Sequence, residues 1–259
     1  MLNIIDTHAH IDMPEFSNDV DSIIHRAKSA GVNRIINPGV TLESNKKAIM
    51  LSEKYEGTIF VALSIHPQNA SEWNDKTYKQ LLTLSNHKSV VAIGETGLDF
   101  FKEYSPKDTQ IEVLKQHIRL AKETGKPLII HDREAHEFVY KILKEEKAYE
   151  VSGVMHCFSG DYDFALRCID LGFYISFTGV ITFPNAKEAQ KTASKLPLEN
   201  ILIETDCPFL SPQIHRGKRN EPAYVVFVAN KLSELQNVPV SEVINVTTSN
   251  AEKLFKLNY

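Results

Sequence analysis

Eight short apolar runs, rich in valine and isoleucine, constrain the fold of this chain more than any other feature of its sequence. Several are apolar at successive positions, which is typical of strands that are covered on both faces. The ends of successive runs lie 21 to 37 residues apart, which leaves room for one helix and short loops between them. The spacing predicts a parallel sheet built from strand–helix–strand units. The predicted strands are Ile4–His8, Arg34–Asn37, Ile59–Ser64, Val90–Ile93, Leu128–His131, Val154–His156, Phe173–Phe177 and Ile201–Glu204.

The segments between these runs have helical periodicity. Asp19–Ala30 and Thr109–Thr124 each place their apolar residues on one face, and Glu221–Phe255 reads as two helices joined around Asn237–Pro239. Eight units within 259 residues favour an α/β fold of the (β/α)8 TIM-barrel type, with parallel strands and extra C-terminal helices. An open doubly wound sheet would show a glycine-rich phosphate turn after an early strand, and the sequence has none. Without any linker or low-complexity stretch, we expect residues 1–259 to form one domain.

Composition narrows the functional classes. A formal net charge of −4 provides no broad basic face, so any contact with a polyanion must be local. No stretch approaches the roughly 20 apolar residues of a membrane span, and the N-terminus shows no secretory signal. The three cysteines have no paired spacing, which is typical of a reducing compartment. We therefore expect a cytoplasmic protein that contacts no membrane and needs no obligate protein partner.

Polar side chains lie at or just after the ends of five of the eight predicted strands, and in such barrels the carboxyl ends of the strands meet at one mouth. His8 ends the first predicted strand and His10 lies two residues further on, and residues two apart in an extended segment point the same way. A lone histidine in such a place is more often a hydrogen-bonded core residue than a ligand. Six buried polar groups without partners would each cost about several kcal/mol, a cost that a metal centre removes. The predicted metal ligands are His8, His10, Glu95, His131, His156 and Asp206.

Six ligands exceed what one small transition metal usually takes from a protein. We therefore predict two divalent ions per chain, of which Mg, Mn, Zn and Ni all suit nitrogen and oxygen donors. Glu95 is the natural bridge because each of its oxygens can bind one ion. Asp206 is the best candidate to orient or deprotonate the attacking water, so Glu95 and Asp206 are the predicted catalytic residues. No serine or cysteine nucleophile motif is present.

The residues around these positions resemble the TatD family of metal-dependent deoxyribonucleases, a branch of the amidohydrolase-like barrels. The resemblance covers essentially the whole chain. It implies one metal-dependent hydrolase barrel domain, with metal on the six residues named above, and no metal position departs from the family pattern. Related barrels with a carboxylated bridging lysine would have lysine where this chain has Glu95. The matching stretches are Asp6–His10, Ile65–Pro67, Gly94–Asp99, Lys126–His131, His156–Gly160, Glu204–Leu210 and Pro212–Pro222.

The resemblance also implies hydrolysis of phosphodiester bonds in DNA by attack of a metal-bound hydroxide, often from the 3′ end. We interpret the chain as a 3′–5′ exonuclease that acts on single-stranded or frayed ends. The alternative is a metal-dependent amidohydrolase or esterase that acts on a small molecule, because fold alone does not determine the reaction. A non-catalytic barrel that keeps a metal for stability is disfavoured, since Glu95 and Asp206 are both present.

DNA contacts are expected mainly at backbone phosphates. Arg216 and Lys218 lie in a loop beyond the last strand that could fold over the mouth, although a solvated basic loop is about equally expected. Arg133 could bind phosphate or cap the following helix, and His66 could contact substrate or only shape a turn. Ser159 could offer a hydroxyl or a backbone N–H to phosphate. These five are the predicted substrate-binding residues.

Aromatic side chains and cysteines also lie near the strand ends. Phe100, Phe101 and Phe158 could stack on bases, with core packing expected for at least one of them. Cys157 and Cys207 neighbour predicted ligands, but neighbours on a strand face opposite ways, so we expect both to be small buried residues. Of the five remaining histidines, His215 is ambiguous because it precedes Arg216, and the other four fall on predicted helices, or at their ends, away from the mouth: His25, His87, His117 and His136.

Overall fold

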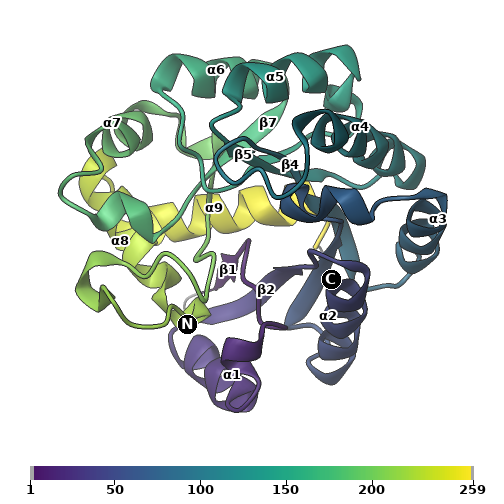
Figure 1. Cartoon of the computed structure of the whole chain (residues 1–259). Coiled ribbons are helices and arrows are strands. Elements are labelled where there is room, and N and C mark those ends of the chain that lie inside the picture. Colours follow the sequence, from purple (N-terminus) through teal and green to yellow (C-terminus); the bar gives the residue numbers. More distant parts are fainter. Residues whose placement is uncertain (1–2, 258–259) are drawn as a thin grey trace.

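The eight predicted strands form one parallel sheet, in chain order, in the computed structural model, which describes residues 3–257. The sheet curls into a nearly closed barrel ringed by helices, which confirms the TIM-type prediction (Figure 1). The first and last strands meet beyond their ends, where the Thr7 amide donates to the Ile203 carbonyl and Ala9 bridges Cys207. The strands are β1 Ile4–Asp6, β2 Val32–Pro38, β3 Ile59–Leu63, β4 Val90–Asp99, β5 Leu128–Arg133, β6 Gly153–Met155, β7 Phe173–Phe177 and β8 Ile201–Ile203.

Helices connect these strands and begin and end at recognisable signals. Thr41 and Ser44 form a reciprocal capping box at the start of α2, and Gly125 ends α4 with a left-handed φ of 63°. The α-helices are α1 Val20–Ser29, α2 Leu42–Lys54, α3 Asp75–Leu84, α4 Lys107–Thr124, α5 His136–Glu145, α6 Tyr162–Asp170, α7 Lys187–Lys195, α8 Val225–Gln236 and α9 Val240–Phe255. Short 3₁₀ helices span Pro14–Phe16, Pro67–Glu72, Ala148–Glu150, Gly179–Thr182, Leu198–Asn200, Gln213–His215 and Pro222–Tyr224.

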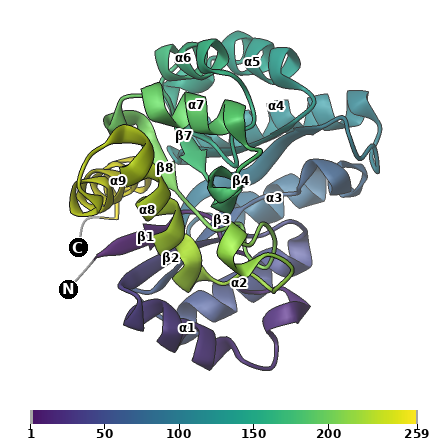
Figure 2. The same cartoon turned by 90° about the vertical axis from the view of Figure 1, so that its left-hand side faces the viewer.

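Two apolar cores hold the barrel together. The larger core lies between the outer face of the strands and the surrounding helices, and the smaller one fills the barrel interior. In the interior core, strand residues such as Ile36 and Ile129 pack with Leu254 and Phe255 of α9. Both views place α9 against the barrel, and Figure 2 shows it at the end where the chain termini lie. The predicted C-terminal helices are therefore present, and α9 closes one end of the barrel.

The strands β4 and β5 are longer than the sequence predicts. Because β4 continues to Asp99 and β5 to Arg133, Glu95 lies within β4 rather than after it, and His131 lies inside β5 rather than at its last position. The register shifts between Ile93 and Thr96, which interrupts the regular pairing with β5 at Glu95. The predicted strands end at Ile93 and His131, close to the ends of their apolar runs, whereas both strands continue through the polar residues that follow.

Within residues 3–257, no helix combines the length and the apolar character that crossing a membrane requires.

Candidate metal centre

His8 and His10 follow β1 and point into the mouth of the barrel together, as their spacing predicts. Their Nε2 atoms lie 3.2 Å apart. A backbone hydrogen bond holds this segment in place, because the His10 amide donates to the Cys207 carbonyl at 2.8 Å. Beneath it, the buried Asp6 carboxylate accepts hydrogen bonds from the Thr205 amide at 2.9 Å and the Thr205 hydroxyl at 2.6 Å. These bonds tie the histidine segment to the end of β8.

Glu95 occupies the middle of the cluster, and its two oxygens face different sets of imidazoles. Oε2 lies 3.2 Å from His8 Nε2 and 3.6 Å from His10 Nε2. A carboxylate in this position can offer one oxygen to each of two ions. Its Oε1 lies 2.6 Å from His131 Nδ1, 3.4 Å from His66 Nε2 and 3.6 Å from His156 Nε2.

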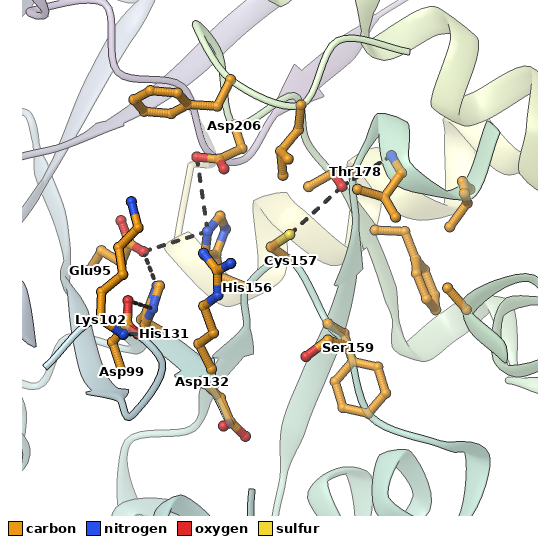
Figure 3. Close-up of a pocket in the computed structure, with 18 of the residues that line it drawn as sticks. Glu95, Asp99, Lys102, His131, Asp132, His156, Cys157, Ser159, Thr178 and Asp206 are labelled. Atoms are coloured by element: carbon orange, nitrogen blue, oxygen red, sulfur yellow. Dashed lines mark hydrogen bonds and ion pairs between the residues drawn. The ribbon is translucent and has the colours of Figure 1, made fainter. Parts of the chain in front are cut away.

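Asp206 completes the cluster from beyond β8. Its backbone has a left-handed φ of 56°, and its Oδ1 atom lies 3.4 Å from His10 Nε2 and 3.8 Å from His8 Nε2. Figure 3 shows Asp206 facing Glu95 and His156 across the cluster. A left-handed backbone at a non-glycine residue is uncommon and is often found at functional positions. The structure thus brings together all six residues that the sequence predicts as metal ligands.

The charges of the cluster are strongly coupled. Burial alone would lower the pKa of His156, but the carboxylates of Glu204 and Glu95 outweigh it and raise that pKa to about 10. Burial likewise disfavours the charged form of His131, yet Asp99 and Glu95 raise its pKa to about 9. Burial would raise the pKa of Glu95, but the imidazoles around it hold that pKa well below its usual range. The ionised carboxylates thus favour positive charge on the groups around them. A divalent cation can supply this positive charge in place of the protons on the imidazoles.

The donor atoms form groups that could each hold a metal ion. The donors of His8, His10 and Glu95 lie within 4.8 Å of one another, and so do those of His66, Glu95 and His131. The two groups share only Glu95, and their nitrogen and oxygen donors suit several divalent ions. His66, which the sequence suggests as a substrate contact, lies within the second group. A third group of donors at the same spacing consists of His8, His156 and Glu204.

Two carboxylates that sequence reasoning missed lie behind the histidines. Glu204 Oε1 is 2.7 Å from His156 Nδ1, and Asp99 Oδ2 is 3.4 Å from His131 Nε2. Carboxylates in such places commonly orient the imidazoles that bind metals. A signal for both exists in the sequence, because Glu204 lies two residues before Asp206 and Asp99 lies four after Glu95.

The cluster opens into a cavity of about 760 Å³. Cys157 and Thr178 line the cavity beside the cluster, with Cys157 Sγ 3.7 Å from Thr178 Oγ1 (Figure 3). The expectation that both Cys157 and Cys207 are buried is wrong for Cys157, which is partly exposed, whereas Cys207 is fully buried. The alternation that predicted its burial no longer applies, because β6 ends at Met155 and Cys157 adopts a left-handed φ of 44°.

Only some of the predicted substrate contacts line this cavity. His66, Arg133 and Ser159 do, and so does Lys102, which sequence reasoning missed. The sequence signal that could have identified Lys102 is its position in the loop after β4.

Arg216 and Lys218 do not line the cavity, and both are exposed. The next residue, Arg219, forms an ion pair with Asp19 at 2.6 Å. Asn220 then donates to the Thr205 carbonyl at 2.8 Å. These contacts fasten the end of the basic loop to Asp19, just before α1, and to the segment after β8, while Arg216 and Lys218 lie outside the cavity lining.

Comparisons with known proteins find relatives that match nearly the whole length of this chain. The family described as "TatD related DNase" matches residues 5–256. The chain is 44% identical to the "uncharacterized metal-dependent hydrolase YabD" of Bacillus subtilis strain 168, over 98% of this chain and 100% of that protein. It is 37% identical to YcfH of Escherichia coli K12, described in the same terms, over 98% and 96% of the two chains.

Solved structures show the same similarity. The crystal structure of YjjV, a TatD homologue from Escherichia coli K12, superposes with a TM-score of 0.92 at 34% identity, and the match covers 98% of each chain. An uncharacterized amidohydrolase from Saccharomyces cerevisiae superposes with a TM-score of 0.87 at 18% identity over 98% of this chain and 100% of that one, a likeness of fold alone.

Proposed function

The chain belongs to the family of TatD-related DNases, which makes it a metal-dependent hydrolase, and on this basis we propose that it hydrolyses phosphodiester bonds in DNA. Single-stranded or frayed 3′ ends are the proposed substrates, and we place the protein in the cytoplasm. The cationic side chains of Lys102 and Arg133 at the cavity support a phosphate-bearing substrate, because they supply local positive charge on a chain whose net charge is −4.

One observation carries the proposal: the two oxygens of Glu95 face separate sets of imidazoles. This arrangement suits two divalent ions bridged by Glu95, with His8, His10 and Asp206 on one side and His131 and His156 on the other. Two bound ions would polarise a phosphoryl oxygen, supply the attacking hydroxide and stabilise the leaving oxygen. Asp206, whose Oδ1 atom lies 3.4 Å from His10 Nε2 and which lines the cavity, would orient the attacking water and accept its proton.

The test uses metal-stripped protein and an end-labelled single-stranded oligonucleotide. Mg, Mn, Ni and Zn are restored one at a time, and products are resolved by length. We expect a metal-dependent ladder that shortens from the 3′ end. Asp206→Asn should lower the rate by about a hundredfold or more, because it removes a general base and a ligand. Asp170→Asn, an exposed change at the end of α6, is the matched control and should keep full activity.

If none of the four ions restores cleavage of the labelled strand, the nuclease proposal is rejected. Activity that survives Asp206→Asn would indicate a contaminating enzyme. A panel of small esters, lactones and amides then tests the alternative of a small-molecule hydrolase with the same loaded protein.

A further inference from the structure

Exposed aromatic side chains gather beside the cavity mouth. Of the five strongly exposed aromatic side chains within residues 3–257, three lie after β4 or at the start of α5: Phe101 is 54% exposed, Tyr104 72% and Phe138 55%. Half-buried Phe100 supports them, since its ring packs edge-to-face on Phe138 with centroids 5.4 Å apart. We call Phe100, Phe101, Tyr104 and Phe138 the aromatic surface. Exposed aromatic groups of this kind commonly mark a binding site.

Cations are interleaved with these rings. The Arg133 guanidinium lies 4.2 Å from the centroid of the Phe101 ring, and Lys102 Nζ lies 5.9 Å from that of Tyr104. Neither cation forms an ion pair within residues 3–257, and both line the cavity that holds the metal cluster. The aromatic surface is therefore continuous with the candidate active site through its two unpaired cations.

The loop that carries Phe100, Phe101 and Tyr104 of the aromatic surface is attached to the cluster of candidate ligands by Asp99. The Asp99 Oδ1 atom accepts hydrogen bonds from the backbone amides of Phe101 at 3.2 Å and Lys102 at 2.8 Å. Its other oxygen, Oδ2, lies 3.4 Å from His131 Nε2. Gln110 of α4 fastens the same turn, accepting from the Asp99 amide at 2.8 Å. The position of the aromatic surface relative to the cluster is thus set by hydrogen bonds.

Aromatic rings interleaved with cations are the features that bind single-stranded nucleic acid. Bases stack on exposed rings, and cations contact the phosphates between the bases. A duplex keeps its bases stacked on each other and cannot offer their faces. We infer that the aromatic surface binds the bases of a single strand whose scissile phosphate lies at the metal cluster. This inference rests on the proposed function for the placement of that phosphate, and it locates the strand on the β4–β5 side rather than on the Arg216 loop.

Binding is tested in the Asp206→Asn background, so that the strand is not cut. The dissociation constant of a fluorescent single strand of about ten nucleotides is measured by anisotropy. The combined change Phe101→Ala with Tyr104→Ala should weaken binding by about tenfold or more, because two stacking rings are lost. Tyr149→Ala is the matched control: Tyr149 is 50% exposed but lies before β6, at the other end of the barrel. Unfolding midpoints of all variants verify that they fold.

Cleavage kinetics in the otherwise wild-type protein provide a second readout. The KM for the oligonucleotide should rise about tenfold in the Phe101 and Tyr104 variant, whereas hydrolysis of bis(p-nitrophenyl) phosphate, too short to reach the surface, should change far less. Unchanged dissociation constants and KM values would overturn the inference, and so would equal binding of single strand and duplex. If the wild-type protein binds the single strand through these rings but cuts no nucleic acid, the proposed function fails and the binding surface stands.

Discussion

His117 is a buried ionisable residue outside the cluster of candidate metal ligands, and it supports a residue of that cluster. Its Nε2 atom accepts a hydrogen bond from the Ile65 amide at 3.1 Å, and its Nδ1 atom donates to the Val113 carbonyl at 2.9 Å. Because a carbonyl can only accept, this pattern requires the neutral imidazole with its proton on Nδ1. Ile65 directly precedes His66 in the chain, so His117 of α4 holds the backbone next to the cluster.

The neutral state of His117 predicts a pH dependence of folding stability. Burial lowers the pKa of His117 from 6.5 to about 4. Between these values the unfolded chain binds a proton that the folded chain does not, so stability falls as pH falls through this window. His117→Gln removes this dependence. We expect the free energy of unfolding of the wild type relative to the variant to fall by about 3 kcal/mol from pH 7 to pH 4.

Urea unfolding across this pH range, followed by circular dichroism, measures the effect. Between pH 7 and pH 8 the difference between the two proteins should be constant, which serves as the internal control. A difference that stays constant down to pH 4 would contradict the assignment of His117 as neutral.

At the scale of elements, the close approach of β4 to β5 brings candidate metal ligands together. Gly97 pairs with His131, and a Cβ atom built on Gly97 would lie 1.8 Å from the His131 carbonyl oxygen. Its φ of 151° is also unfavourable for other residues. Since Glu95 lies two residues before Gly97 on the same strand, glycine here allows two proposed ligands to come together.

We predict that Gly97→Ala separates β4 from β5. The variant should lose about 3 kcal/mol of stability or more, because the overlap is with backbone and cannot be relieved by a side-chain rotation. Gly57→Ala is the matched control, because Gly57 also has a positive φ, of 74°, but nothing lies within 4 Å of its Cβ position. That change should cost only about 1 kcal/mol. Chemical denaturation measures both, and equal losses would show that backbone conformation rather than contact with β5 requires glycine at residue 97.

At the scale of the whole molecule, the proposed metal centre joins distant parts of the barrel. Its candidate ligands come from β4 and β5 and from the segments after β1, β6 and β8. Ligands from five strands are assembled only in the folded protein, so ions bound there would stabilise the folded state over the unfolded chain.

Removal of the metal should therefore lower the unfolding temperature. At free ion concentrations about a thousandfold above the dissociation constant, binding contributes about 4 kcal/mol, which corresponds to a loss of about 10 °C for a chain of this size. Differential scanning calorimetry of the protein before and after chelation measures the shift. In the Glu95→Ala variant, which lacks the proposed bridging carboxylate, chelation should lower the unfolding temperature much less. A wild-type Tm that chelation leaves unchanged would argue against a metal centre built from these residues.

Much of the fold of this protein, and part of its candidate site, follows from local sequence pattern. Eight apolar runs at regular spacing predicted the strands and their order, because strand formation and side-chain alternation depend on near neighbours. The same alternation placed His8 and His10 on one side of the chain, and barrel geometry placed them beside Glu95 and Asp206. Chain order and alternation were enough for these features, since all parallel strands end at the same mouth.

Other features were decided only by contacts between segments far apart in the chain. His66 lies in the cluster, where His117 of α4 holds the neighbouring Ile65 amide, and the end of the basic loop is fixed by the ion pair of Arg219 with Asp19. These partners are separated by 52 residues for His117 and by 200 residues for Arg219. No local pattern encodes which distant group a side chain will meet, because that choice depends on how the surrounding elements pack.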